Sequence, residues 1–223
     1  KLIEFINHQT YFRNGKTYNK KTKRVIFALI VVHVWGNAVN LDKIYNLCKK
    51  RNIKIIEDAS ESFGSKYTIG KFKNKYTGTI GDIGCFSFNT NKIITCGSGG
   101  MIVTNKKIFF DRAVYLANQA KDDTIKYIHN DVGYNYRLNN LNAAVGFAQL
   151  EKFSIIYKKK KEIFNYYKFL LRNSKNIKLV ETPPYADNNR WMILVTFNKL
   201  KISIIDTIKY LSKKNIEDRP VWH

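Results

Sequence analysis

A strand–helix–strand pattern over residues 25–58 places the strongest constraint on what this chain can fold into. Residues 25–36 (VIFALIVVHVWG) form an apolar run between basic residues and a Gly-Asn pair, which predicts a strand buried on both faces. A helical pattern follows Asn40, and residues 53–58 (IKIIED) then predict a second short strand. This order is typical of a βαβ unit, so the sheet is predicted to be mostly parallel.

Two further strands and two helices are predicted after this unit. The strands cover residues 85–88 and 101–104, and the helices cover about 106–120 and 140–171. Four apolar residues of the second helix recur at helical spacing and are expected to face a core: Leu141, Ala144, Val145 and Ala148.

The pattern of predicted strands and helices changes in the last third of the chain. After two consecutive prolines, residues 191–197 predict a strand and residues 203–214 a short helix. We therefore predict an α/β fold with an incomplete large domain over residues 1–154, whose mostly parallel sheet is flanked by helices. Residues 155–223 are predicted to be part of a small α+β domain.

Charge is the feature of the composition that bears most on partners. The chain has 39 Lys and Arg against 17 Asp and Glu, a formal net charge of +22. Such a charge by itself suggests nucleic acid or an anionic surface. The basic residues are spread along the chain and no nucleic-acid motif accompanies them, so we favour a bias in amino-acid usage and predict no nucleic-acid partner. The longest apolar run is far shorter than the roughly 20 residues that span a bilayer, so no membrane partner is predicted.

The three cysteines, Cys48, Cys85 and Cys96, form no C-x-x-C pair. No His or Cys cluster has the spacing of metal ligands, so no metal site is predicted. Thiols without a disulfide framework are typical of a reducing compartment, which predicts a cytoplasmic location. The chain begins at Lys1 and not at Met, as expected of a fragment of a longer protein.

Two charged residues at ends of predicted strands are candidates for chemistry. Asp58 ends the second strand and could face a ligand or, about equally well, cap a following helix. Lys92 lies in a loop between two apolar strands. It could be a solvated loop charge, or a desolvated amine that attacks a carbonyl carbon.

Four segments, in their order along the chain, resemble one enzyme family. They are EDASESFG at residues 57–64, GDIGCFSFNTNK at 81–92, GSGGMIVT at 97–104 and GYNYRLNNLNAAVGFAQLE at 133–151. These segments resemble the pyridoxal-phosphate sugar aminotransferases of the DegT/DnrJ/EryC1/StrS type, which have the fold of the type I enzymes. The segments HVWGNAVNLDKI, QAKDD and RPVW are most similar to the branch that acts on UDP-4-keto sugars, as in bacillosamine- or legionaminic-acid-type synthesis.

The resemblance implies a role for each of three residues at a pyridoxal 5'-phosphate site. Lys92 would bind the cofactor covalently through its amine and then carry a proton between the substrate carbon and the cofactor. Asp58 would pair with the pyridine nitrogen and keep it protonated. Ser87 would donate a hydrogen bond to the cofactor phosphate.

The resemblance also implies a homodimer with shared active sites. Asn135, and with it Arg137, would reach the phosphate of the cofactor in the neighbouring subunit. Glu61 stands where many relatives carry Gln or His near the ring hydroxyl, so it is expected at the cofactor while its role is left open.

The activity implied is transfer of an amino group from glutamate to a nucleotide-linked, here UDP-linked, 4-keto-6-deoxy sugar for surface polysaccharide or glycan precursors. Relatives that dehydrate sugars carry His in place of the lysine, so Lys92 favours transamination over a pyridoxal-phosphate-dependent dehydratase. An inactive fragment, or a basic interaction protein without catalysis, is the remaining alternative.

Several other residues are predicted to be structural. His33 is expected to be a satisfied core histidine more than a pocket residue. Trp191 and Trp222 are expected to pack more than to line a sugar site, and residues 158–161 (KKKK) to form the solvated face of a helix.

Overall fold

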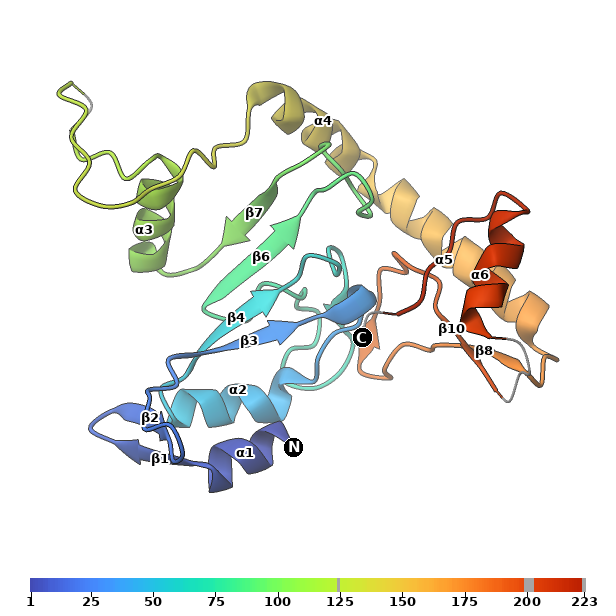
Figure 1. Ribbon diagram of the computed structural model, residues 1–223, viewed down its shortest axis with the longest axis horizontal. Coiled ribbons are helices and arrows are strands. Elements are labelled where there is room, and N and C mark those ends of the chain that lie inside the picture. Colours follow the sequence, from blue (N-terminus) through green and yellow to red (C-terminus); the bar gives the residue numbers. More distant parts are fainter. Residues whose placement is uncertain (124, 199–202, 222–223) are drawn as a thin grey trace. The chain divides into compact units, whose positions relative to one another are not determined.

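The computed structural model describes residues 1–123, 125–198 and 203–221 of the chain (Figure 1). Its elements in chain order are α1 (Leu2–His8), β1 (Thr10–Arg13), β2 (Lys16–Asn19), β3 (Ala28–Val32), a 3-10 turn (Val34–Gly36), α2 (Leu41–Lys50), β4 (Lys54–Asp58), β5 (Lys66–Tyr67), β6 (Ile83–Ser87), β7 (Gly100–Val103), α3 (Lys107–Ala117), α4 (Asn140–Glu151), α5 (Phe153–Leu171), β8 (Ile177–Leu179), β9 (Ala186–Asp187), β10 (Val195–Phe197) and α6 (Ile204–Ser212).

The chain forms two compact units. The first consists of Lys1–Ile163 with Thr182–Met192, and the second of Phe164–Glu181 with Ile193–His223. The predicted boundary between a large domain (residues 1–154) and a small domain (residues 155–223) stays a prediction.

The first unit contains a four-stranded sheet in the order β3-β4-β6-β7 (Figure 1). Strands β3, β4 and β6 are parallel, and β7 runs antiparallel to β6. Helix α2 connects β3 to β4 and packs alongside them, as a βαβ unit requires. The predicted α/β class with a mostly parallel sheet is confirmed.

Strand β3 is buried on one face only, so the prediction of burial on both faces is wrong. Val31 is 5% exposed and packs with Leu41 and Cys48 of α2, whereas its neighbour Ile30 is 63% exposed. Successive side chains of a strand point to opposite faces, so Val31 and Ile30 lie on opposite faces of the sheet. Helix α2 covers the side of Val31, and among the described residues nothing comparable covers Ile30.

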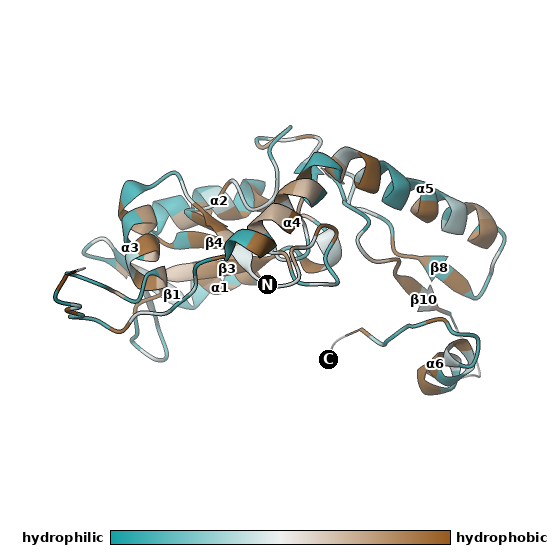
Figure 2. Cartoon of the chain, turned by 90° about the horizontal axis from the view of Figure 1, so that it is seen from above, coloured by the Kyte–Doolittle hydropathy of each residue, from teal (hydrophilic) through white to brown (hydrophobic). Residues whose placement is uncertain are grey.

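The predicted helix over residues 140–171 is two helices, α4 and α5, separated at Lys152. Asn139 caps α4, since its Oδ1 accepts from the backbone N–H of Asn142 at 2.8 Å. Along α5, hydrophilic and hydrophobic residues alternate (Figure 2). The apolar residues predicted to face a core from α4 do not do so in this structure, because Leu141 is 81% exposed and α4 has no buried residue.

An N-terminal hairpin, β1–β2, was not predicted from the sequence. Asn14 and Gly15 both have positive φ in its two-residue turn, the conformation that an Asn-Gly pair favours in hairpins. The hairpin is fixed to the end of α2, since Thr17 Oγ1 donates to the carbonyl of Arg51 and Asn52 Nδ2 donates to the carbonyl of Gly15.

The second unit is built on the antiparallel pair β8 and β10, with α6 following. The strand predicted over residues 191–197 forms only from Val195, because Trp191 belongs to the first unit. Helix α6 confirms the short helix predicted over residues 203–214. Trp222 lies outside the described residues.

Candidate active site

Asp58, Cys85 and Ser87 lie on one face of the sheet at the carboxyl ends of two parallel strands. The register of β4 and β6 pairs Asp58 with Cys85, and Ser87 is two residues further along β6. Residues two apart on a strand face the same side, and ligands of α/β sheets collect beyond this edge. Burial and then the charge of Asp58 raise the pKa of the Cys85 thiol, which agrees with the closeness of these two side chains.

Asp58 stabilises a turn and leaves one carboxylate oxygen available. Its Oδ1 accepts from the backbone N–H of Ser60 at 3.0 Å and from the Ser60 hydroxyl. No helix begins here, so Asp58 is not a helix cap. Within residues 1–123, 125–198 and 203–221, the structure records no hydrogen bond to Asp58 Oδ2. This oxygen can therefore accept from a ligand N–H.

Lys92 is paired with Glu61 and is not a solvated loop charge. Lys92 Nζ lies 3.9 Å from Glu61 Oε1, and the two side chains are only 14% and 11% exposed. The other oxygen of Glu61, Oε2, accepts from the backbone N–H of Trp35 at 2.6 Å. The amine and the carboxylate that the resemblance places at the cofactor are thus brought together by two separate loops.

A buried pair, His33 and Glu57, lies on the other face of the sheet and joins the turn after β3 to the segment before β6. His33 Nδ1 accepts from the backbone N–H of Val39, so Nε2 carries the ring hydrogen and donates to Glu57 Oε2 at 2.9 Å. Glu57 also accepts from the backbone N–H groups of Gly78, Ile80 and Gly81. His33 is therefore the satisfied core histidine that the sequence predicted, and Glu57 is a buried structural carboxylate that the sequence analysis did not single out.

The hydrogen bonds of Glu57 make its charge part of the stability of the fold. Burial by itself would raise the pKa of Glu57, but the hydrogen bonds from His33, Gly81 and Gly78 outweigh it and the pKa lies below its usual value. A carboxyl with a lowered pKa stabilises the folded chain above its unfolded pKa of about 4.3, and this contribution is lost as the pH falls through the folded pKa.

We expect Glu57→Gln to lower the free energy of unfolding by about 3 kcal/mol at pH 7, because the amide nitrogen of Gln would face backbone N–H donors. Urea titrations between pH 7 and pH 3 should show the difference from wild type shrinking below about pH 4.3. Glu162→Gln, at an exposed pair with Lys159, is the control and should change stability by less than about 0.5 kcal/mol. A difference that is independent of pH would contradict the assignment.

Trp191 is a site residue whose position the sequence analysis did not foresee. It is 6% exposed, so the prediction that it packs is confirmed, but it packs on the candidate site. The centroid of its ring lies 4.4 Å from Lys92 Nζ. No local pattern could have indicated this contact, because the two residues come from distant parts of the sequence.

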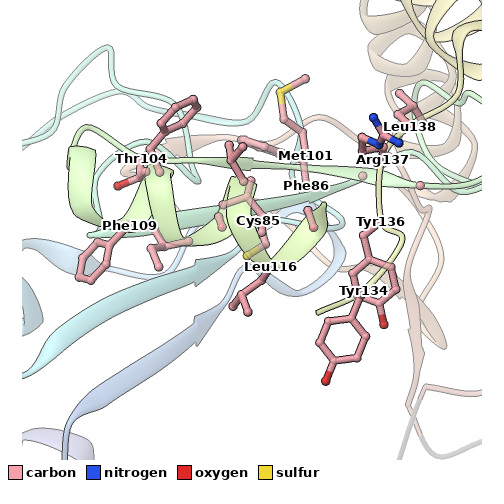
Figure 3. A pocket seen from close by; sticks show the side chains of 18 of the residues that line it. Cys85, Phe86, Met101, Thr104, Phe109, Leu116, Tyr134, Tyr136, Arg137 and Leu138 are labelled. Atoms are coloured by element: carbon pink, nitrogen blue, oxygen red, sulfur yellow. The ribbon is translucent and has the colours of Figure 1, made fainter. Parts of the chain in front are cut away.

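Asn135 and Arg137 lie on an exposed segment between α3 and α4. Asn135 forms an isolated bridge with Asn118. Arg137 lines a largely apolar cavity of about 890 Å³ beside β6, β7 and α3, with the stacked rings of Tyr134 and Tyr136 next to it (Figure 3). None of the other five predicted site residues lines this cavity. In the described part of the chain, no contact joins Asn135 or Arg137 to the cluster of Lys92 and Glu61.

The residues present fit the pyridoxal phosphate that the resemblance implies. Lys92 offers an amine of low exposure, and Asp58 Oδ2 offers an acceptor for a ring N–H. Ser87 Oγ accepts only a long hydrogen bond, 3.4 Å, from the backbone N–H of Asn89, so its own hydroxyl hydrogen can be donated to a phosphate oxygen.

The lysine run of α5 is solvated only in part. Lys158 and Lys159 are exposed, but Lys160 Nζ donates to the carbonyl of Trp191 and Lys161 pairs with Asp187 at 2.8 Å. The prediction of a wholly solvated face is therefore wrong for the second half of the run, because residues 187–191 return to cover it.

Residues 1–123, 125–198 and 203–221 contain neither a cluster of metal ligands nor a helix able to span a membrane. No group of three or more His, Cys, Asp or Glu side chains there could hold a metal ion. None of the helices described is long and apolar enough to cross a membrane.

Comparison with known proteins decides the family. The sequence profile of the DegT/DnrJ/EryC1/StrS aminotransferase family matches residues 7–223. The chain belongs to this family. This match confirms, over nearly the whole chain, the family resemblance that the four motifs indicated.

Curated relatives of this chain are named for different nucleotide sugars. GDP-perosamine synthase of Escherichia coli O157:H7 is 36% identical over 221 residues, 97% of this chain and 57% of its own length. UDP-4-amino-4,6-dideoxy-N-acetyl-beta-L-altrosamine transaminase of Campylobacter jejuni is 33% identical over 177 residues, 76% of this chain and 44% of its own. The chain thus spans about half the length of the curated relatives it matches.

A solved structure confirms the fold. The Escherichia coli GDP-4-keto-6-deoxy-D-mannose-3-dehydratase with bound hydrated pyridoxal phosphate superposes with a TM-score of 0.74 at 23% sequence identity. It covers 87% of this chain and 53% of its own. A structural similarity at 23% sequence identity establishes the fold alone.

Proposed function

We propose that this protein is a pyridoxal-phosphate-dependent aminotransferase that moves an amino group from glutamate to a nucleotide-linked 4-keto-6-deoxy sugar. The observation that carries the proposal is the weakly exposed Lys92 amine beside Glu61, on the loop that follows β6. Membership of the family and relatives named as sugar transaminases support it. The product would be a precursor of surface polysaccharide or glycan.

Four side chains of this chain would hold the cofactor and carry out the proton transfers. Pyridoxal phosphate, when bound, supplies an electron-withdrawing ring that makes amino transfer between two carbon skeletons possible. Asp58 Oδ2 would keep a proton on the ring nitrogen, and Ser87 would donate to the phosphate. Lys92 Nζ would take a proton from one carbon and return it to another, and Glu61 would hold Nζ near that path.

The identity of the nucleotide, UDP or GDP, is a separate part of the proposal. The sequence motifs favour UDP, whereas one relative is named for a GDP sugar and another for a UDP sugar. The proposal therefore specifies a 4-keto-6-deoxy sugar on a nucleoside diphosphate, and the assay compares the two bases. The cytoplasmic location and the lack of a nucleic-acid partner stay predictions.

We expect 2-oxoglutarate to form from glutamate, in amounts exceeding the enzyme, only when cofactor and a 4-keto-6-deoxy sugar linked to UDP or GDP are both present. Mass spectrometry of the sugar should show an amino group in place of the keto oxygen. Aspartate in place of glutamate is the control for the amino donor. Failure with both nucleotide sugars, in protein that has bound the cofactor, would contradict the proposal.

A second copy of this chain is proposed as the partner that completes the site. Large apolar side chains are exposed along α4 and the segment before it: Ile125, Tyr127, Val132, Tyr136, Leu141 and Phe147. Apolar surface gathered over neighbouring elements is typical of protein interfaces. Asn135 and Arg137 lie within this surface, as expected of residues that act in a partner's site.

A further inference from the structure

Residues 188–191 connect three parts of the candidate site. They belong to the Thr182–Met192 segment, which returns from the second unit to pack in the first. Asn188 Nδ2 donates to the carbonyl of Trp35 and to Asn37 Oδ1, in the turn that follows β3. Asn189 reaches the loop that carries Glu61, and Trp191 reaches the loop that carries Lys92.

Asn189 is the fully buried centre of this segment. Its Nδ2 donates to the carbonyls of Glu61 at 2.8 Å and Phe63 at 3.1 Å, and its backbone N–H donates to Ser65 Oγ at 3.0 Å. A Cβ at Gly36, where φ is +82°, would lie 2.2 Å from Asn189 Oδ1. Only glycine fits there, so the turn after β3 is adapted to this asparagine.

Trp191 is held through both its backbone and its ring. Its backbone N–H donates to Asn189 Oδ1 at 3.0 Å, and its carbonyl accepts from Lys160 Nζ at 3.3 Å. The ring nitrogen Nε1 donates at 2.5 Å to the carbonyl of Asn91, which immediately precedes Lys92 and is 100 residues away from Trp191 in sequence. Because the ring is bonded to the peptide that precedes Lys92, it cannot move away from Lys92 without breaking the Nε1 hydrogen bond.

Glu61 alone does not fix the Lys92 amine. Its Oε1 is 3.9 Å from Nζ, which is an ion-pair distance and too long for a hydrogen bond. The ring of Trp191, with its centroid 4.4 Å from Nζ, supplies a second attractive surface through a cation–π contact. The amine is thus held between a carboxylate and an aromatic face, both nearly excluded from water.

We propose that Trp191 is a positioning residue that, together with Glu61, sets where the Lys92 amine points. The inference builds on the proposed function, in which this amine forms the covalent link to the cofactor. It assigns to Trp191 the positioning of an amine, where the sequence favoured packing over the lining of a sugar site.

The contact itself is tested in the purified protein without cofactor, by trace acetylation of lysines and peptide mass spectrometry. Trp191→Leu is expected to raise the acetylation rate of Lys92 about tenfold. Tyr45→Leu is the matched control, because Lys71 Nζ lies over the Tyr45 ring at the same 4.4 Å in another part of the first unit. That variant should leave Lys92 unchanged. An unchanged rate at Lys92 in Trp191→Leu would overturn the proposal.

The positioning role is tested with pyridoxal phosphate and borohydride, which turns the link into a stable secondary amine that peptide mapping locates. Per folded molecule, judged by circular dichroism, Trp191→Leu should label Lys92 about tenfold more slowly than wild type, because an amine that is freer toward a small reagent no longer points at the carbonyl carbon of bound cofactor. Trp191→Phe, which keeps an aromatic face, should recover most of the rate. Equal rates in all three would show that Trp191 only packs. Wild-type protein that labels no Lys92 would refute the proposed function, and the acetylation ratio would still decide whether Trp191 holds the amine.

Discussion

Lys92→Ala is expected to reduce amino transfer by at least about a thousandfold, because the substitution removes both the covalent anchor and the group that moves the proton. The fold should stay near native. The substitution removes one ion pair and one cation–π contact, which together contribute about 1–2 kcal/mol to the free energy of unfolding. Turnover from glutamate, with unfolding followed in parallel by circular dichroism, separates loss of chemistry from loss of structure.

Two companion variants sharpen this result. Lys71→Ala removes a lysine with a comparable aromatic contact away from the site and should keep full activity. Asp58→Asn should still allow borohydride labelling of Lys92 but slow transfer about a hundredfold or more, because an amide does not hold a proton on the ring nitrogen. Labelling of a different lysine in wild-type protein would refute the assignment of Lys92, and an Asp58→Asn rate within a few-fold of wild type would refute that of Asp58.

The parts of the fold that could be predicted are those governed by local pattern. The run of apolar residues that contains Val31 and the helical spacing of Leu41 and Cys48 each need only their own segment, and the structure buries all three. The strand that ends at Asp58 is likewise set by its own residues. Connection handedness and the order of elements then leave few arrangements besides a parallel sheet.

The parts that could not be predicted depend on what packs against each segment. Ile30 and Leu141 have the apolar character of core residues, yet they are exposed because no described element covers them. Trp191 shows the opposite case, since its contact with Lys92 arises only when a distant segment returns to the first unit. Glu57 and Asp58 are neighbouring carboxylates in sequence, and only the structure shows that Glu57 is fully buried while Asp58 lies beside Cys85 on the other face.

An active site built from two subunits predicts a second large effect. Mixing two variants that are each inactive should restore activity. Asn135 is exposed on the proposed interface, and its amide can donate to a phosphate oxygen without adding charge. Asn135→Ala should therefore bind pyridoxal phosphate more weakly. At a cofactor concentration that leaves this variant mostly unloaded, both it and Lys92→Ala should be nearly inactive alone.

A heterodimer of these two variants has one site with both lesions and one site with neither, provided that Asn135 acts across the interface. Two-fold symmetry then predicts about half of the wild-type activity per heterodimer. Mixing the variants under conditions that exchange subunits, with purification of the heterodimer through two different tags, measures this directly. A mixture of Lys92→Ala with Asp58→Asn is the control, since both residues would serve the same subunit's site and no full site can form. Absence of recovery with Asn135→Ala, or full activity of Asn135→Ala alone, would show that Asn135 does not act in the partner's site.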